Sequence, residues 1–161
     1  MSAAPRRSAA LAFAAAISLV AVGVALWTQH ALDMQPCAWC VLQRLIFVAI
    51  ALAALPGVLW QRGLVQALSA VLMLALGVAG VAAALWQHFV AAKTASCALT
   101  LADRIVGGLG FDTRWPEVFE VRASCADAAT NLLGVPFEFW SLALFMLISV
   151  LALRLLLRRA A

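Results

Sequence analysis

Four long apolar runs dominate the hydrophobic pattern of the chain, and short polar stretches separate them. Each run supplies about the 20 apolar residues that a helix needs to cross a hydrocarbon core of about 30 Å. The pattern predicts an all-α fold, in which four membrane-spanning helices form a bundle in a single domain over residues 1–161. The predicted spans are residues 8–27, 41–60, 64–86 and 139–157.

The composition agrees with a lipid bilayer as the partner of these helices. Of the 161 residues, 66% are hydrophobic and 11% are charged. A soluble domain of this size has too little interior to bury so much apolar surface. We therefore expect an integral membrane protein.

The positive charges predict how the bundle is oriented. Arginines flank the short connections, and the positive-inside rule places such residues in the cytoplasm together with both termini. The outer segments are then residues 28–40 and 87–138. The net charge of +4 is thus a signal of topology and gives no reason to expect nucleic-acid binding. The inner arginines are Arg6, Arg7, Arg62, Arg158 and Arg159, with Arg154 nearby.

All four cysteines fall in or beside the outer segments, where an oxidising compartment allows disulfides to persist. Cys37 and Cys40 form a Cys-x-x-Cys motif at the start of the second span, where helix N–H groups favour a thiolate. A redox-active pair, half of a zinc site and a static disulfide are the alternatives. Zinc would need two further ligands, and Cys97 and Cys125 have no paired spacing, so the redox role is favoured.

Cys97 and Cys125 have two possible roles of their own. They could form a structural bridge across the long outer loop, or they could exchange with the first pair if the loop moves. Helical spacing also places Arg44 on the same stripe as Cys37 and Cys40. Arg44 could snorkel to the interface, or it could hold an anionic acceptor and stabilise a thiolate.

Other residues predict further features of the outer half. Apolar positions at helical spacing predict a short interfacial helix over residues 98–109, and residues 131–136 read as the end of a helical turn. Gly77 and Gly80 would allow close helix packing. Five tryptophans at span ends predict an aromatic belt: Trp27, Trp39, Trp60, Trp86 and Trp140.

The order of these motifs resembles the disulfide-bond-formation protein B family of bacterial inner membranes. The likeness covers nearly the whole chain. It rests on Cys37 to Cys40 followed by Gln43-Arg44, on Ser96-Cys97, and on the run from Trp115 to Cys125-Ala126 that leads to the last span at Trp140.

The resemblance implies a quinone-dependent protein thiol oxidase. Electrons would pass from a soluble periplasmic thiol oxidase of thioredoxin fold (DsbA-like) to ubiquinone or menaquinone. By analogy, Cys97 receives the partner's thiolate and Cys125 resolves that bond. The Cys37/Cys40 pair then takes the electrons, with Cys40 next to the quinone.

By the same analogy Arg44 holds the quinone oxygens, and His88 lies near them, although Gln87 beside it differs from the acidic versions of the family. Two alternatives stay open. One is a paralogue dedicated to a single partner. The other is a haem- or metal-binding membrane subunit that uses His30 and His88 and has structural disulfides.

Overall fold

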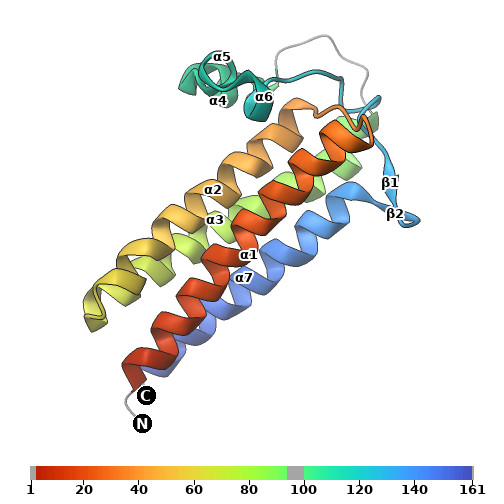
Figure 1. Ribbon diagram of the computed structural model, residues 1–161. Coiled ribbons are helices and arrows are strands. Elements are labelled where there is room, and N and C mark those ends of the chain that lie inside the picture. The colour runs from red at the N-terminus through yellow and green to blue at the C-terminus, as the bar shows by residue number, and fades with distance from the viewer. Residues whose placement is uncertain (1–2, 94–99, 161) are drawn as a thin grey trace.

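Four long helices form a tilted bundle in the computed structural model, which describes residues 3–93 and 100–160 (Figure 1). The start of the first helix and the end of the last lie at one end of the bundle. The other end holds the long loop with Cys125 and the start of the second long helix, where Cys37 and Cys40 lie. The four helices are α1 (Ala3–Ala31), α2 (Ala38–Leu59), α3 (Gly63–Phe89) and α7 (Phe137–Ala160).

These helices confirm the four predicted spans, since each is long and apolar enough to cross a membrane. Each helix also continues beyond its predicted span. α1 extends to Ala31 and α2 begins at Ala38, so the first outer segment is shorter than residues 28–40. Hydropathy misses these turns because a helix continues into the interface, where polar residues are tolerated.

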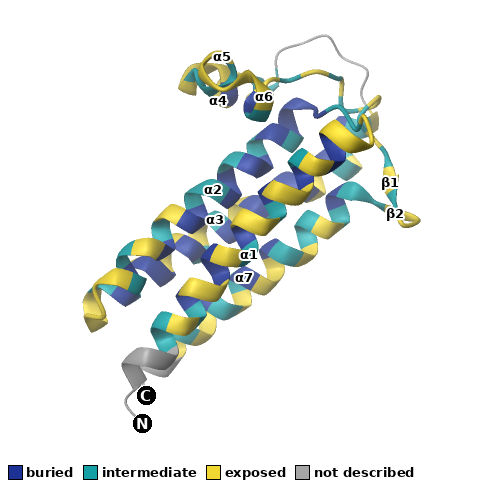
Figure 2. Cartoon of the chain, viewed as in Figure 1, coloured by how far each residue is buried: buried dark blue, intermediate teal, exposed yellow. Residues whose placement is uncertain are grey.

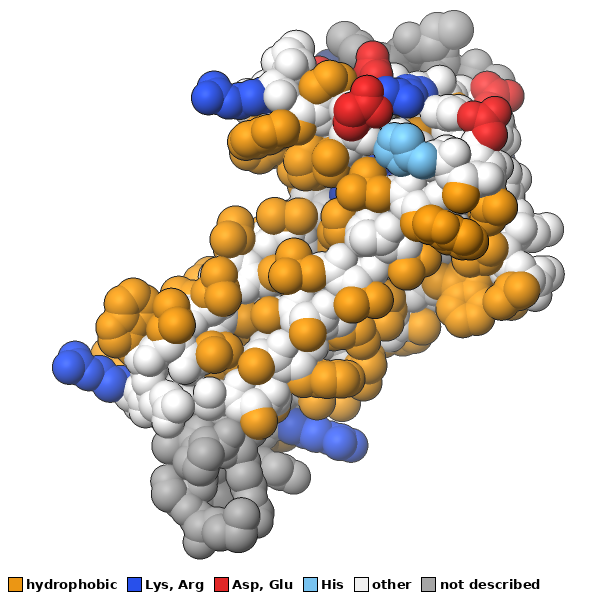
Figure 3. Space-filling model, in the orientation of Figure 1, with side chains coloured by type: hydrophobic (Ala, Val, Ile, Leu, Met, Phe, Trp, Pro, Cys, Tyr) orange, Lys and Arg blue, Asp and Glu red, His pale blue; other side chains and the backbone are white. Residues whose placement is uncertain are grey.

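The surface of the bundle has the polarity that a bilayer requires. Buried residues face the centre of the bundle and exposed residues face outward (Figure 2). On the face shown in Figure 3, hydrophobic side chains cover the middle of the bundle and the charged side chains gather toward its two ends. Large apolar residues such as Leu19, Leu72 and Val150 are exposed in this middle band, as a lipid-facing surface requires.

At the centre of the bundle, two aromatic rings stack on each other and one of them packs against a glycine. Phe145 of α7 is fully buried and stacks on Phe47 of α2 with ring centroids 4.0 Å apart. A Cβ atom at Gly80 of α3 would lie 2.4 Å from the Phe145 ring, and one at Gly77 would lie 2.4 Å from Ser149 Oγ. The predicted close packing at these two glycines is therefore confirmed.

The end of the bundle opposite the two termini carries a row of short helices that are docked on α2. Val106 and Phe119 of this row are buried against Val41 of α2 and form a second apolar cluster. Thr100 and Asp103 form a capping box that starts α4, which confirms a short helix in the described part of the predicted range, and its place at the membrane interface stays a prediction. The row consists of α4 (Leu101–Leu109), α5 (Phe111–Arg114) and α6 (Pro116–Phe119), whereas a 3₁₀ turn at Ala91–Lys93 follows α3 and packs on it.

Two expectations about this end are wrong. Residues 131–136 form a small antiparallel hairpin of β1 (Asn131–Leu132) and β2 (Val135–Pro136), with positive φ angles at Leu133 and Gly134 that make a two-residue turn. Trp39 does not join the exposed tryptophans of the belt, because it is buried and packs near Trp86 with ring centroids 6.3 Å apart.

Candidate redox site

The first feature of the site is the cap of α2, which Cys37 provides. Its backbone is extended, and its Sγ accepts a hydrogen bond from the Cys40 N–H at 3.4 Å. The cap brings Cys37 Sγ to 2.9 Å from Cys40 Sγ, and both cysteines are free thiols. A small movement of either sulfur would therefore close a disulfide, whose bond length is about 2.05 Å.

A third sulfur reaches this pair from the long loop. The backbone N–H groups of Arg122 and Ala123 both donate to the Pro36 carbonyl, at 3.0 and 3.2 Å. These bonds tie the segment before Cys125 to the residue before Cys37. The Cys37 thiol in turn hydrogen-bonds to Cys125, which is also a free thiol. Cys125, Cys37 and Cys40 thus form a continuous sulfur cluster.

The pKa values of Cys37 and Cys125 are shifted in opposite directions. The hydrogen bonds to Cys125 and Cys40, together with burial, raise the pKa of the Cys37 thiol. The hydrogen bond from Cys37 lowers the pKa of Cys125 below its ordinary value. Of these two thiols, Cys125 is therefore the more easily ionised, and the thiolate is the form that attacks disulfides. Cys97, the fourth predicted cysteine, lies outside the described residues.

Two buried amides adjoin the far side of Cys40. The Gln87 side chain on α3 donates its Nε2 hydrogen to Cys40 Sγ at 3.2 Å. Gln43, one turn beyond Cys40 on α2, donates to Gln87 Oε1 at 2.6 Å. Both glutamines are buried. The Gln87 donor offers stabilisation to a negatively charged sulfur at Cys40.

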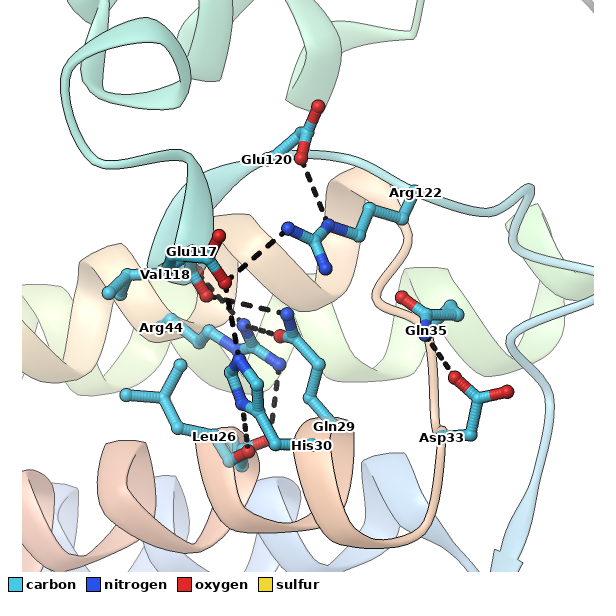
Figure 4. Close-up of polar contacts among 11 residues, drawn as sticks. Leu26, Gln29, His30, Asp33, Gln35, Arg44, Glu117, Val118, Glu120 and Arg122 are labelled. Atoms are coloured by element: carbon cyan, nitrogen blue, oxygen red, sulfur yellow. Dashed lines mark hydrogen bonds and ion pairs between the residues drawn. The ribbon is translucent and has the colours of Figure 1, made fainter.

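Arg44 lies in the same region and is buried among neutral acceptors. Its guanidinium donates to Gln29 Oε1 at 2.7 Å, to the Val118 carbonyl at 2.9 Å and to the Ala25 carbonyl at 3.2 Å (Figure 4). Arg44 is 5% exposed, and it takes part in none of the ion pairs of the described residues. A buried cation with only neutral partners leaves a positive field that favours an anion beside it.

The contacts of Arg44 also join the loop to the bundle. Gln29 of α1 accepts from Arg44 and donates to the Glu117 carbonyl of α6 at 3.3 Å. Glu117 is flanked by His30 at 3.4 Å and by Arg122 at 3.6 Å (Figure 4). Helix α6 is therefore fixed directly to the arginine that follows the Cys-x-x-Cys motif.

A cavity of about 290 Å³ opens beside Cys40 and Arg44, between α1, α2 and α7. This volume is close to the lower end of the range for small-molecule sites, roughly 300–1,000 Å³. Most of its wall is apolar, and most of its polar groups belong to the end of the bundle where Cys37 and Cys40 lie. These polar lining residues are Thr28, Gln35, Cys40, Gln43, Arg44, Gln87, Thr130, Glu138 and Ser141.

His88, which the resemblance places near the quinone, lies next to the cavity. Its ring is not among the residues that line this cavity, whereas its neighbour Gln87 is. His88 Nδ1 instead contacts Glu138 Oε1 at 2.6 Å, and Glu138 lines the cavity. The histidine is thus connected to the cavity through a buried carboxylate.

His30 and His88 are each held by a separate glutamate, Glu117 and Glu138. Within the described ranges 3–93 and 100–160, no group of three or more His, Cys, Asp or Glu side chains has an arrangement that could hold a metal ion. The geometry of these residues therefore gives no support to the metal-binding alternative.

Sequence reasoning missed the roles of three polar residues of the site, namely Gln29, Glu138, and Gln87 as a hydrogen-bond donor to Cys40. A signal was present, because each is a polar residue within an apolar helix, and such residues are expensive in a membrane unless they have a function or a partner. Their partners lie far away in the sequence, so the pattern alone did not identify them.

One protein family matches nearly the whole chain. The family model described as disulfide bond formation protein DsbB matches residues 6–155. The chain is similar to disulfide bond formation protein B of Aromatoleum aromaticum, with 32% identity over 86% of this chain and 85% of that protein. It is also similar to disulfide bond formation protein B 1 of Pseudomonas syringae pv. syringae, with 36% identity over 84% and 80% of the two chains.

Four membrane-spanning helices and this match make the chain a multi-pass protein of the bacterial inner membrane. Its cysteines supply the thiol chemistry that disulfide formation needs. The chain therefore belongs to the family of disulfide bond formation protein DsbB.

Proposed function

We propose that this protein reoxidises the dithiol of a periplasmic, DsbA-like thiol oxidase of thioredoxin fold and passes the electrons to a membrane quinone, ubiquinone or menaquinone. One observation carries the proposal: the sulfur cluster runs from the loop residue Cys125 through Cys37 to Cys40, and Cys40 lines the cavity. Electrons entering at the loop have a path of sulfurs that ends at the cavity wall.

The thiol steps balance as exchanges of one S–S bond for another. A partner thiolate attacks Cys97 of a Cys97–Cys125 disulfide, forms a mixed disulfide and releases the Cys125 thiolate. The partner's second thiolate then attacks the partner's first sulfur in this mixed disulfide, which forms the partner's own disulfide and releases the Cys97 thiolate. The Cys125 thiolate attacks Cys37 of a Cys37–Cys40 disulfide and releases the Cys40 thiolate. Attack of the Cys97 thiolate on Cys125 then restores the loop disulfide and leaves Cys37 and Cys40 reduced.

The surroundings of Cys40 suit its role as the leaving sulfur. A thiolate leaves faster when its charge is stabilised. Gln87 donates a hydrogen bond to Cys40 Sγ, and the positive charge of Arg44 acts on the same sulfur. Cys37, in contrast, lies between the other two sulfurs and is fully buried, as the attacked atom of an internal exchange should be.

The residues around the cavity fit a quinone ring. The apolar walls suit the ring, and Arg44 and the buried amides of Gln43 and Gln87 would hold its oxygens. When bound, a quinone supplies a sink for two electrons and two protons. Arg44 would also favour negative charge in the cavity, since its present partners are neutral.

The proposed orientation places the sulfur cluster on the periplasmic side and both termini in the cytoplasm. Arg62 lies in the turn between α2 and α3, at the opposite end of α2 from Cys37, and Arg7 and Arg154 lie toward the two terminal ends of the chain. These charges support the orientation through the positive-inside rule.

The function is tested with the purified protein, a reduced DsbA-like partner and a short-chain ubiquinone. We expect one quinone to be reduced for each disulfide formed in the partner, and we expect Cys40→Ser to abolish quinone reduction. Oxidation of the partner without quinone reduction would contradict the proposal.

A second experiment tests the roles in the loop. A partner whose second cysteine is replaced by serine should stay attached to Cys97, because no partner thiol remains to release it, and a non-reducing gel should show the mixed disulfide. The Cys125→Ser protein has no loop disulfide to attack, so it should neither form this adduct nor oxidise the wild-type partner. Partner oxidation at the normal rate in that variant would refute these roles. Testing several thioredoxin-fold proteins would separate a general oxidase from one that is dedicated to a single partner.

A further inference from the structure

Glu138 is a carboxylate in an unusual place. It lies in the first turn of α7, it is 5% exposed, and it lines the cavity beside Cys40 and Arg44. A carboxyl group at membrane depth is expensive to bury, so it is by default a candidate for function, together with its partner.

The partner of Glu138 is His88, whose Nδ1 lies 2.6 Å from Glu138 Oε1. The His88 side chain is 30% exposed, whereas that of Glu138 is 5% exposed. Phe89 and Phe139 pack on the histidine ring, with centroids 4.9 and 4.6 Å away, and fix its orientation. His88 is thus partly exposed at the protein surface, while Glu138 lines the cavity.

Few other groups around the cavity can exchange protons. Of the described residues on its wall, the ionisable ones are Cys40 and Arg44 of α2 and Glu138 of α7. The parts of α1 and of the β1–β2 hairpin that line it contribute no ionisable side chain, and α3 contributes Gln87 there and His88 behind Glu138. Arginine keeps its proton in proteins and amides do not titrate, so among the described residues on this wall Glu138 is the one non-sulfur group that can take up and release a proton.

We propose that His88 and Glu138 form a proton-transfer pair that carries protons between the outer solution and the cavity. His88 takes a proton from solution at Nε2 and gives the one at Nδ1 to Glu138, and the Glu138 carboxyl group holds it at the cavity wall. This proposal rests on the proposed function, and it names the proton donor for that reaction.

The balance of the reaction gives the pair its task. Oxidation of a dithiol to a disulfide releases two electrons and two protons, and reduction of a quinone consumes two of each. The electrons travel along the sulfurs, whereas the protons of attacking thiols are lost to solution when the thiolates form. Protons must therefore return to the cavity by a separate route.

The first test compares Glu138→Gln and His88→Gln with Glu120→Gln, which removes an exposed loop carboxylate that contacts Arg122. Loss of a general acid typically slows a step by about 100-fold or more. We expect this slowing in the single-turnover reduction of short-chain ubiquinone by Glu138→Gln, with the attack of reduced partner on the protein unchanged. Acetate should restore part of the rate in Glu138→Ala. Wild-type rates of quinone reduction in both Gln variants would overturn the proposal.

A second readout uses the protein without quinone, so its result is independent of the proposed function. Infrared spectra recorded across a range of pH should contain a carboxylic-acid band that is lost in Glu138→Gln and kept in Glu120→Gln. On transfer to D₂O, this band should shift rapidly in the wild type and slowly in His88→Gln, because the histidine is the route. Equal exchange in the two proteins would remove His88 from the pathway. If Glu138→Gln does not fold, His88→Gln carries both tests.

Discussion

Gln87 Nε2 lies 3.2 Å from Cys40 Sγ and joins α3 directly to the sulfur at the cavity wall. At the other end of the same amide, Gln87 Oε1 accepts a hydrogen bond from Gln43 Nε2 at 2.6 Å. The Gln87 amide is therefore oriented by one residue and acts on another, and it stabilises the reduced form of the Cys37/Cys40 pair when Cys40 is ionised.

Replacing Gln87 with leucine should lower the reduction potential of the Cys37–Cys40 disulfide. A hydrogen bond to a charged group contributes about 1.5–3 kcal/mol, and its loss destabilises the reduced form. The potential should then fall by roughly 30–60 mV, as measured against thiol buffers in a protein whose Cys97 and Cys125 are serines. Gln43→Leu, which leaves the sulfur contact in place, should cause a smaller change. A potential unchanged by Gln87→Leu would show that this contact does not stabilise the thiolate.

The hydrogen bond between Cys37 and Cys125 predicts the order in which the two thiols are alkylated in the fully reduced protein. The hydrogen bond from Cys37 lowers the pKa of Cys125 and raises that of Cys37, so Cys125 should carry thiolate at a lower pH. Iodoacetamide labelling followed by peptide mass spectrometry should find Cys125 modified at lower pH than Cys37. Cys37→Ala should shift the Cys125 profile to higher pH, whereas Cys40→Ala should not. If Cys37→Ala leaves the pH dependence of Cys125 alkylation unchanged, the hydrogen bond is refuted.

Arg44→Ala should weaken the use of quinone more than it alters the attack of the partner. Removal of a charge-assisted contact of about 1.5–3 kcal/mol corresponds to a rise of about tenfold or more in the KM for quinone. Steady-state kinetics with short-chain ubiquinone would measure it. The matched control is Arg62→Ala, an exposed arginine at the opposite end of α2. Equal quinone KM values in the two variants would exclude Arg44 from the acceptor site.

Gly80→Ala should destabilise the bundle, because a Cβ atom there would lie 2.4 Å from the Phe145 ring. The stack of Phe145 on Phe47 would have to shift, and overpacking of this kind costs about 1–3 kcal/mol. Gly23→Ala in α1 is the control, since nothing lies within 4 Å of its added methyl group. Unfolding of both variants in mixed micelles would measure the difference in free energy. A Gly80→Ala protein as stable as the control would show that the helices can move apart at this point.

The sequence was sufficient for the parts of the fold that the bilayer dictates. The length of an apolar run is enough to predict a spanning helix. Helical spacing also predicts that Arg44 lies on the same face of α2 as Cys40, and both residues line the same cavity. The hairpin was missed because its turn has leucine at a positive φ before Gly134, and leucine is an unusual residue there.

Contacts between distant segments were beyond the reach of the sequence. The approach of Cys125 to Cys37 depends on two backbone bonds to the Pro36 carbonyl, and backbone bonds leave no trace in side-chain patterns. The burial of Trp39 depends on the packing of α3 beside it, near Trp86. The resemblance to a family supplied roles for the cysteines, but Gln87 and Glu138 emerged from the structure.

The most direct test of the sulfur path is disulfide mapping of a Cys40→Ser, Cys97→Ser protein that is reduced and then oxidised in its native, membrane-embedded form. Only Cys37 and Cys125 remain in this chain, and they should join in a disulfide that proteolysis and mass spectrometry recover as one linked peptide pair. Recovery of both cysteines as free thiols, under conditions that oxidise the wild-type Cys37–Cys40 pair, would contradict electron transfer from the loop to α2.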